Sequence, residues 1–210
     1  MSNIIALHQA LPRNENSNVP IAPRRKNRDV RQREHLTVEE VERMIRAAKK
    51  TGRHGQRDAT LILLAFRHAL RVSELIELSW HQIDLEGRNK VLHVVRLKNG
   101  TPATHPLDRR EVLALRELRK LYGESSRVFV TERGEALSPS LVRYLVKRAG
   151  QLARLQLDVH PHMLRHACGY FLANRGTDTR TIQAYMGHKS ITHTVRYTEL
   201  APDRFRGLFD

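Results

Sequence analysis

Apolar residues recur at helical spacing along most of the chain. The capping box Thr37-Val38-Glu39-Glu40 predicts a helix that begins there and runs to about Lys50. The segment from about Arg57 to Leu70 is apolar almost all round, which is typical of a helix buried in the core. A short helix beginning at Ser73 is predicted to follow it.

The spacing changes to that of strands between residues 83 and 107. Ile83–Leu85 and Lys90–Leu97 contain β-branched residues and flank a turn at Gly87. Lys98-Asn99-Gly100 is a hairpin signal, so Thr101–Leu107 is expected to form a third strand. The chain is therefore predicted to be mainly α with a small antiparallel β-sheet, an α+β fold.

Helical spacing returns after the predicted sheet. One helix is expected over Asp108–Tyr122 and another after Ser138-Pro139, because serine is a good N-cap and proline suits the first turn. Residues 126–130 are expected to form a short strand between them. Three more helices are expected, over residues 161–174, 177–186 and 190–200. In the helix over Asp108–Tyr122 and the helix after Ser138-Pro139, the residues predicted to face the core are Val112, Leu115, Leu118, Leu121, Leu141, Leu145, Ala149 and Leu152.

The chain carries a large excess of positive charge. Its 210 residues include 37 Lys and Arg against 22 Asp and Glu, for a formal charge of +15. This charge favours a polyanionic partner, either nucleic acid or an anionic membrane. The longest apolar stretch, Ala59–Phe66, is far shorter than the roughly 20 residues of a membrane span, and the N-terminus lacks the pattern of a signal peptide. We therefore expect a cytoplasmic protein that binds nucleic acid.

Residues 1–35 show little apolar periodicity and contain a basic cluster that includes Arg24, Arg25 and Lys26. Such a run is typical of a mobile arm that follows DNA, although a solvated charge run or an expression remnant has the same composition. The folded domain is expected to cover residues 36–210. Its single cysteine, Cys168, excludes a disulfide within the chain and is expected to be a small core residue.

Several polar residues could carry chemistry, and each alone also has an ordinary structural explanation. His162 and Arg165 share a helix face near its N-terminus, where an anion is favoured, but surface pairs of this kind are common. An arginine directly after the buried helix could simply pair with Glu74. A lysine in a hairpin, a histidine after a glycine and a packed tyrosine are equally ordinary. In chain order these candidates are Arg71, Lys98, His162, Arg165, His188 and Tyr197.

Taken together, the stretches around these residues resemble the tyrosine recombinase (phage integrase) family. The resemblance covers Leu36 to Thr198, and it makes the six candidates the catalytic set. A closer resemblance is to the small fimbrial phase-switch recombinases, which invert a promoter segment. It is carried by Arg96–Gly100, Thr104–Leu107 and His160–His166. Those enzymes lack the usual N-terminal core-binding domain, so none is expected here, which leaves the usual two-domain clamp on DNA in doubt.

The resemblance implies a role for each residue that suits its chemistry. Arg71 and Arg165 would hold the non-bridging phosphate oxygens, with Glu74 orienting Arg71. The remaining roles are nucleophile for Tyr197, base for His162, phosphate hydrogen bond for His188 and general acid for Lys98. Arg143 and Lys147, one turn apart on the polar side of a helix, are expected to contact DNA.

No cofactor is expected, and no metal, although His160, His162 and His166 leave a metal site as a minor alternative. The expected activity is site-specific recombination through a covalent 3′-phosphotyrosine, with inversion, integration or excision as the outcome. The alternatives are type IB topoisomerase-like relaxation and a catalytically silent DNA-binding regulator. The expected partner is double-stranded DNA with inverted-repeat sites. We expect a monomer in solution, because only 13 residues follow Tyr197, and a tetramer on paired sites.

Overall fold

The computed structural model describes residues 33–96, 100–123 and 125–199. Lys98 and the basic cluster of Arg24, Arg25 and Lys26 lie outside the described residues. In chain order the elements are α2 (Val38–Lys49), α3 (Gly55–Arg67), α4 (Val72–Glu77), the 3₁₀ helix η1 (Trp80–Gln82), β1 (Ile83–Asp84), β2 (Val91–Val94), β3 (Ala103–Pro106), α5 (Arg109–Tyr122), α6 (Pro139–Leu152), α7 (Pro161–Asn174), α8 (Thr179–Met186) and α9 (Thr192–Glu199).

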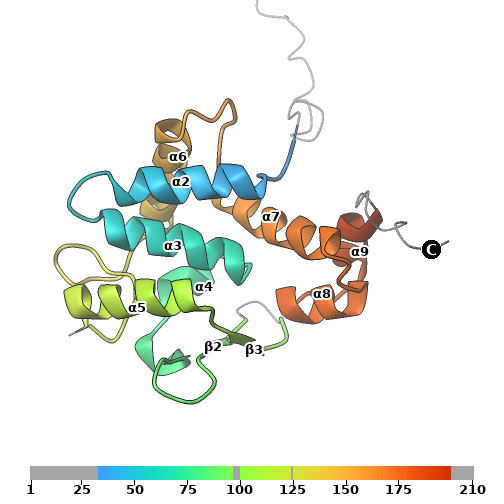
Figure 1. Cartoon of the computed structure of the whole chain (residues 1–210), viewed down its shortest axis with the longest axis horizontal. Coiled ribbons are helices and arrows are strands. Elements are labelled where there is room, and N and C mark those ends of the chain that lie inside the picture. Colours follow the sequence, from blue (N-terminus) through green and yellow to red (C-terminus); the bar gives the residue numbers. More distant parts are fainter. Residues whose placement is uncertain (1–32, 97–99, 124, 200–210) are drawn as a thin grey trace, which may run out of the picture. The chain divides into compact units, whose positions relative to one another are not determined.

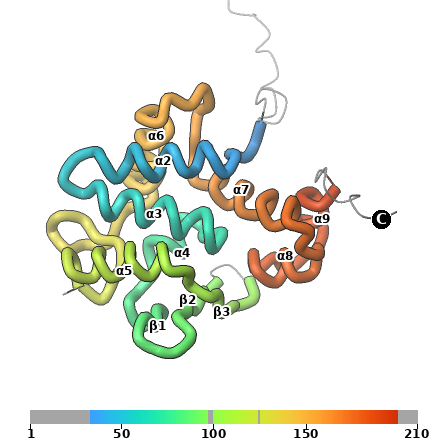
Figure 2. Tube along the Cα trace, viewed as in Figure 1, coloured from blue at the N-terminus to red at the C-terminus, as the bar shows by residue number. Residues whose placement is uncertain are grey.

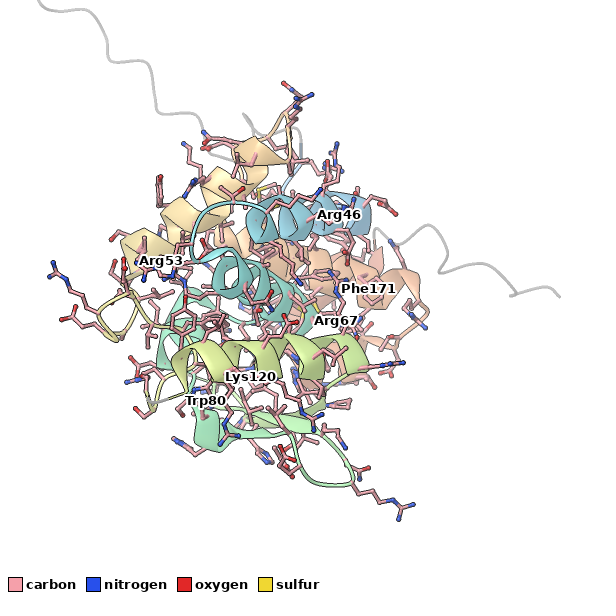
Figure 3. All side chains as sticks on the ribbon, turned by 60° about the vertical axis from the view of Figure 1, so that its left-hand side comes forward. Arg46, Arg53, Arg67, Trp80, Lys120 and Phe171 are labelled. Atoms are coloured by element: carbon pink, nitrogen blue, oxygen red, sulfur yellow. The ribbon has the colours of Figure 1, made fainter. Side chains whose placement is uncertain are left out.

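The helix α3 forms the centre of the core. It packs against α2, α5 and α7, and residues 59–66 of α3 are all buried (Figure 1). On the α7 side the rings of Phe66 and Phe171 lie 5.9 Å apart, and Figure 3 shows Phe171 close to Arg67 of α3. The prediction of an almost wholly apolar core helix is confirmed. No helix in the described part of the chain is long and apolar enough to cross a bilayer.

Side-chain caps explain where several helices begin. In α2 the Thr37 hydroxyl accepts from the Glu40 backbone N–H, and the Glu40 carboxylate accepts from the Thr37 N–H. Asp108 and Glu111 make the same reciprocal pair at the start of α5. Ser138 caps α6 ahead of a proline, as the sequence predicts.

The three strands form one antiparallel sheet in the order β1-β2-β3, with Leu92 opposite His105. The sheet lies beside α8, which β3 contacts (Figure 2). The strands are shorter than predicted, and the expected strand over residues 126–130 is wrong. Arg127 pairs with Ser79 and Val130 with Ala136 as isolated bridges, so no continuous ladder of hydrogen bonds forms there.

The prediction that Leu121 and Leu152 lie in the core is wrong. Leu121 is 61% exposed and Leu152 is 45% exposed. Both lie in the last turn of their helices, where helical spacing continues after the packed surface has ended. In α6 the predicted core residues Leu145 and Ala149 are buried, and Val142 and Val146 join them on the buried face.

The helix α5 offers a matched test of this packing. Leu118 is fully buried and Leu121 is exposed, one turn apart on one helix. We expect Leu118→Ala to lower the free energy of unfolding by about 2–5 kcal/mol, because it leaves a cavity. Leu121→Ala should change it by no more than about 0.5 kcal/mol. Urea unfolding of both variants measures the difference, and equal costs would contradict this account of the core.

Candidate active site

The site begins where α3 ends. The backbone of Ala69 is left-handed, with φ 51°, and the Leu70 N–H donates to the Ala65 carbonyl at 3.2 Å. This is the hydrogen-bond pattern of a Schellman motif, in which the left-handed residue is usually glycine. The sharp turn leads directly to Arg71, which is the N-cap of α4.

The carboxylate of Glu74 joins two arginines. Its Oε1 accepts from Arg71 Nη1 at 2.8 Å, and its Oε2 accepts from the Arg71 backbone N–H and from Arg96 Nη1, both at 2.8 Å. The predicted pairing of Glu74 with Arg71 is therefore present. Arg96 was not predicted as a site residue, although it stands two positions before Lys98 in the same motif. Only its hydrophilic character in a strand pattern could have drawn attention to it.

Arg165 lies deeper than its predicted role suggests. Its guanidinium donates to the carbonyl of Ala69, and through Nη2 to the carbonyl of Met186 at 2.7 Å. Burial, together with the positive charges of Arg71 and Arg96, lowers the pKa of Arg165 to about 10, so it stays charged at neutral pH. Two guanidinium groups thus bind one carboxylate and a third lies within its electrostatic influence, and the excess positive charge favours an anion.

The other member of the predicted His-x-x-Arg pair faces solvent. His162 is exposed on α7 while Arg165 is buried, so the two side chains point into different surroundings. The ring of His162 lies 6.5 Å from that of His166, one turn further along the helix.

Tyr197 of α9 is 1% exposed. Its hydroxyl lies 2.9 Å from Nδ1 of His166, a residue that was not predicted as part of the site although it ends the His162–His166 motif. The ring also lies so close to Gly169 that a Cβ there would be 2.8 Å from three ring atoms. Burial raises the pKa of Tyr197 to about 12, although Arg165 and Arg196 oppose that shift. The tyrosine is therefore packed in the core, and its hydroxyl is held by a histidine.

His188 follows the end of α8. Gly187 has the left-handed conformation that ends the helix, with φ 64°, and His188 Nδ1 lies 2.9 Å from the Thr194 hydroxyl. The ring of His188 stacks toward that of Tyr197, with centroids 6.3 Å apart. Burial and the neighbouring Arg165 and Arg71 lower the pKa of His188 to about 3, so the ring is neutral at pH 7.

The fold brings these elements to one place. The ends of α3, α7 and α8 meet through the bonds of Arg165, and α9 lies against α7 and α8. Arg96 and Gly100, the described residues on either side of residues 97–99, also lie here, since a Cβ on Gly100 would be 2.7 Å from Arg96 and 2.9 Å from the Gly187 carbonyl. The structure therefore assembles Arg71, Arg165, His188 and Tyr197 with the base of the hairpin.

The predicted DNA-contacting residues of α6 are at the surface. Arg143 is exposed and forms no ion pair within the described ranges, whereas Lys147 pairs with Asp158 at 3.1 Å. Tyr144, which was not predicted, is 57% exposed between them. No cluster of three His, Cys, Asp or Glu side chains among the described residues could hold a metal ion. Cys168 is buried, as predicted for a core residue.

Known proteins are similar to this chain in sequence and in fold. Residues 34–204 match the model of the phage integrase family. The chain is 44% identical to the type 1 fimbriae regulatory protein FimB of Escherichia coli K12, over 87% of this chain and 92% of that protein. It is 45% identical to FimE of the same strain, over 85% of this chain and 91% of that protein. The crystal structure of XerA recombinase is similar, with a TM-score of 0.71 and 26% identity over 82% of this chain. This chain spans only 62% of XerA.

One buried histidine and two partly buried ones predict how stability depends on pH. Burial lowers the pKa of His105 to about 3, of His166 to about 4 and of His188 to about 3. Unfolded histidine titrates at about 6.5, so below that pH the unfolded chain binds protons that the folded chain does not. We expect the thermal midpoint to fall as the pH drops from about 7.5 to about 5. His105→Asn should make that dependence shallower, and substitution of the exposed His93 should not. A midpoint independent of pH would contradict the neutral state of these three rings in the folded protein.

Proposed function

This chain belongs to the phage integrase family of tyrosine-type site-specific recombinases, and from that premise we propose that it cuts and rejoins DNA through Tyr197. The observation that carries the proposal is the meeting of Arg71, Arg165, His188 and Tyr197 in one place, from four separate helices or helix ends. Similarity to FimB and FimE over nearly their whole length favours inversion of a regulatory DNA segment as the outcome.

In the proposed reaction, one phosphodiester bond of the DNA is exchanged for a phosphotyrosine bond to the protein. The Tyr197 oxygen attacks phosphorus, a 3′-phosphotyrosine forms, and the 5′ oxygen leaves with a proton from Lys98. Later a 5′ hydroxyl attacks the phosphotyrosine, so a new diester forms and the phenol is released. The number of ester bonds is the same before and after, and no cofactor or metal takes part.

The arginines would stabilise the charge that develops on phosphorus oxygens. Arg71 is partly exposed, and Arg165 uses two of the five N–H donors of a guanidinium on backbone carbonyls, which leaves donors for phosphate. Charge stabilisation of this kind is normally the largest contribution to such a reaction. His188, neutral at pH 7, would donate one hydrogen bond to the phosphate.

Two imidazoles can receive the phenolic proton. His162 was assigned this role from the sequence, but His166 is the one within hydrogen-bond reach of the Tyr197 hydroxyl, at 2.9 Å. Burial lowers the pKa of His166 to about 4, with Arg196 and His162 contributing, so the ring is a weak base before DNA binds. An incoming phosphate would raise that pKa through its negative charge and make His166 a better acceptor for the phenolic proton.

The proposal extends to partners and organisation. We propose a single catalytic domain over residues 36–210, preceded by a basic arm that follows the DNA backbone, acting in the cytoplasm at the chromosome. The DNA would carry inverted-repeat sites, with the protein monomeric in solution and tetrameric on paired sites. Type IB topoisomerase-like relaxation and a silent regulator remain the competing functions. Strand exchange between two sites separates recombination from relaxation, and any covalent adduct rules out a silent regulator.

The proposed function makes a first prediction about the nucleophile. Tyr197→Phe removes only the phenolic oxygen, so we expect it to abolish covalent protein–DNA adducts while leaving DNA affinity within about threefold, a change of less than about 1 kcal/mol. A nicked suicide substrate that traps the adduct is the measurement. Tyr170→Phe is the matched control, because this neighbouring ring lies 5.1 Å from that of Tyr197 on α7 and has no proposed chemical role. An adduct that persists in Tyr197→Phe would refute the assignment.

The second prediction separates backbone contacts from base contacts. Removing residues 1–32 should flatten the slope of log affinity against log salt by about 0.9 for each phosphate that the arm neutralises. The cut stops before Arg33, because this residue pairs with Glu40 at 2.6 Å. Arg143→Ala should change that slope little but reduce discrimination between the cognate site and a variant site by about 1–3 kcal/mol. Fluorescence anisotropy at several salt concentrations measures both, and an unchanged slope after truncation would show that the arm does not contact phosphates.

A further inference from the structure

Arg96 is a buried arginine that none of the proposed chemical steps uses. Its side chain is fully buried at 0% exposure, so it cannot reach DNA from that position. An isolated buried charge is costly, and the usual solution is a close partner of opposite charge. Arg96 has such a partner in Glu74, but it has other partners as well.

The guanidinium of Arg96 joins three elements. Nη1 donates to Glu74 Oε2 at 2.8 Å, and Nη2 donates to the backbone carbonyl of Tyr185 at 2.6 Å. Longer bonds of 3.3 and 3.4 Å reach the carbonyls of His68 and Ala69. These contacts tie the end of β2 to the α3–α4 junction and to the last turn of α8.

The stem of Arg96 is enclosed by two glycines. A Cβ on Gly187 would lie 2.7–2.9 Å from Nε, Cγ and Cδ of Arg96, and a Cβ on Gly100 would lie 2.7 Å from its Cβ. The turn that carries His188 is therefore packed directly on the arginine. A side chain at either glycine position would occupy the space that the Arg96 side chain now fills.

We propose that Arg96 is a positioning residue for cleavage, which holds Arg71 through the shared carboxylate of Glu74 and holds the His188 turn through the Tyr185 carbonyl and Gly187. This inference rests on the proposed function, because positioning is defined by the reaction. Glu74 binds Arg71 with one oxygen and Arg96 with the other, so its carboxylate has a single orientation while both guanidiniums are present.

The forked shape of arginine is what the arrangement requires. The two Nη atoms of one planar group reach Glu74 and Tyr185 at the same time, which the single ammonium of lysine does not reproduce. Without Arg96, Oε2 of Glu74 keeps only its bond from the Arg71 backbone N–H, so the carboxylate is held less firmly and can shift together with the Arg71 side chain. A displacement of about 1 Å in a catalytic group costs on the order of 100-fold in rate.

The test is a double-mutant cycle on single-turnover cleavage at saturating DNA. We expect Arg96→Met to slow adduct formation on the order of 100-fold in the wild-type background. In an Arg71→Ala background, the same substitution should cost less than about fivefold, because the effect that passes through Arg71 is removed and only the effect on the His188 turn remains. DNA affinity should stay within about threefold in every variant. An equal decrease in rate in both backgrounds, or no decrease in either, overturns the proposal.

Arg57 provides the matched control. It is another buried arginine, paired with Asp58 at 2.8 Å and with the Val130 carbonyl at 2.9 Å, and it is not part of the site. Arg57→Met should lower the thermal midpoint as Arg96→Met does, yet leave the cleavage rate of the folded protein unchanged. If Arg96→Met unfolds at the assay temperature, Arg96→Lys keeps the buried charge and should still slow cleavage in the wild-type background alone.

A spectroscopic readout keeps this inference separate from the proposed function. The ¹⁵N signal of Arg71 Nε–H, assigned by its disappearance in Arg71→Lys, should shift in Arg96→Met and stay in place in Arg57→Met. A wild-type protein that forms no Tyr197 adduct would refute the proposed function, and with it the role of Arg96 in cleavage. An Arg71 signal that does not respond to Arg96→Met would refute the positioning of Arg71 even if cleavage proceeds at Tyr197.

Discussion

The buried carboxylate of Glu74 is the interaction on which the site depends. It is the one acid among Arg71, Arg96 and Arg165 in the described part of the chain, and its side chain is only 2% exposed. Leaving a buried guanidinium without a partner is expensive, so the carboxylate must stay where two arginines can share it. That requirement connects the start of α4 to the end of β2, which are 22 residues apart in sequence. One negative charge against three positive ones also leaves the region electrostatically incomplete without an anion.

Backbone carbonyls supply the rest of the support. Ala69, Tyr185 and Met186 each present a carbonyl to Arg96 or Arg165, and these carbonyls are available because α3 and α8 end there. The last carbonyls of a helix have no partner within the helix and carry partial negative charge. The left-handed conformations of Ala69 and Gly187 turn the chain at these ends. The site is therefore built where helices terminate, and the same turns deliver Arg71 and His188.

Local signals account for what could be predicted from the sequence. Capping pairs such as Thr37 with Glu40 and the apolar spacing of α3 depend on neighbours along the chain, and both are present in the structure. The catalytic candidates came from their order and context, not from any contact. His166 and Arg96 were missed because their roles arise from partners 31 and 22 residues away, which no local pattern records. Leu121 and Leu152 failed for a related reason, since helical spacing does not reveal where a packing surface ends.

The buried state of Tyr197 follows from the same arrangement. Its ring can lie against α7 only because position 169 is glycine, and its hydroxyl is paired with His166 on the same helix. Burial that raises the pKa of Tyr197 to about 12 makes the phenol a poor nucleophile, whereas Arg165 and Arg196 act in the opposite direction. The negative charge of a bound phosphate would partly offset the positive charge of Arg165 and weaken that opposing effect on the phenol. In the proposed reaction, deprotonation of Tyr197 would therefore coincide with its approach to phosphorus, where Arg71 and Arg165 would share the developing charge, because neither burial nor the arginines alone would produce a free phenolate.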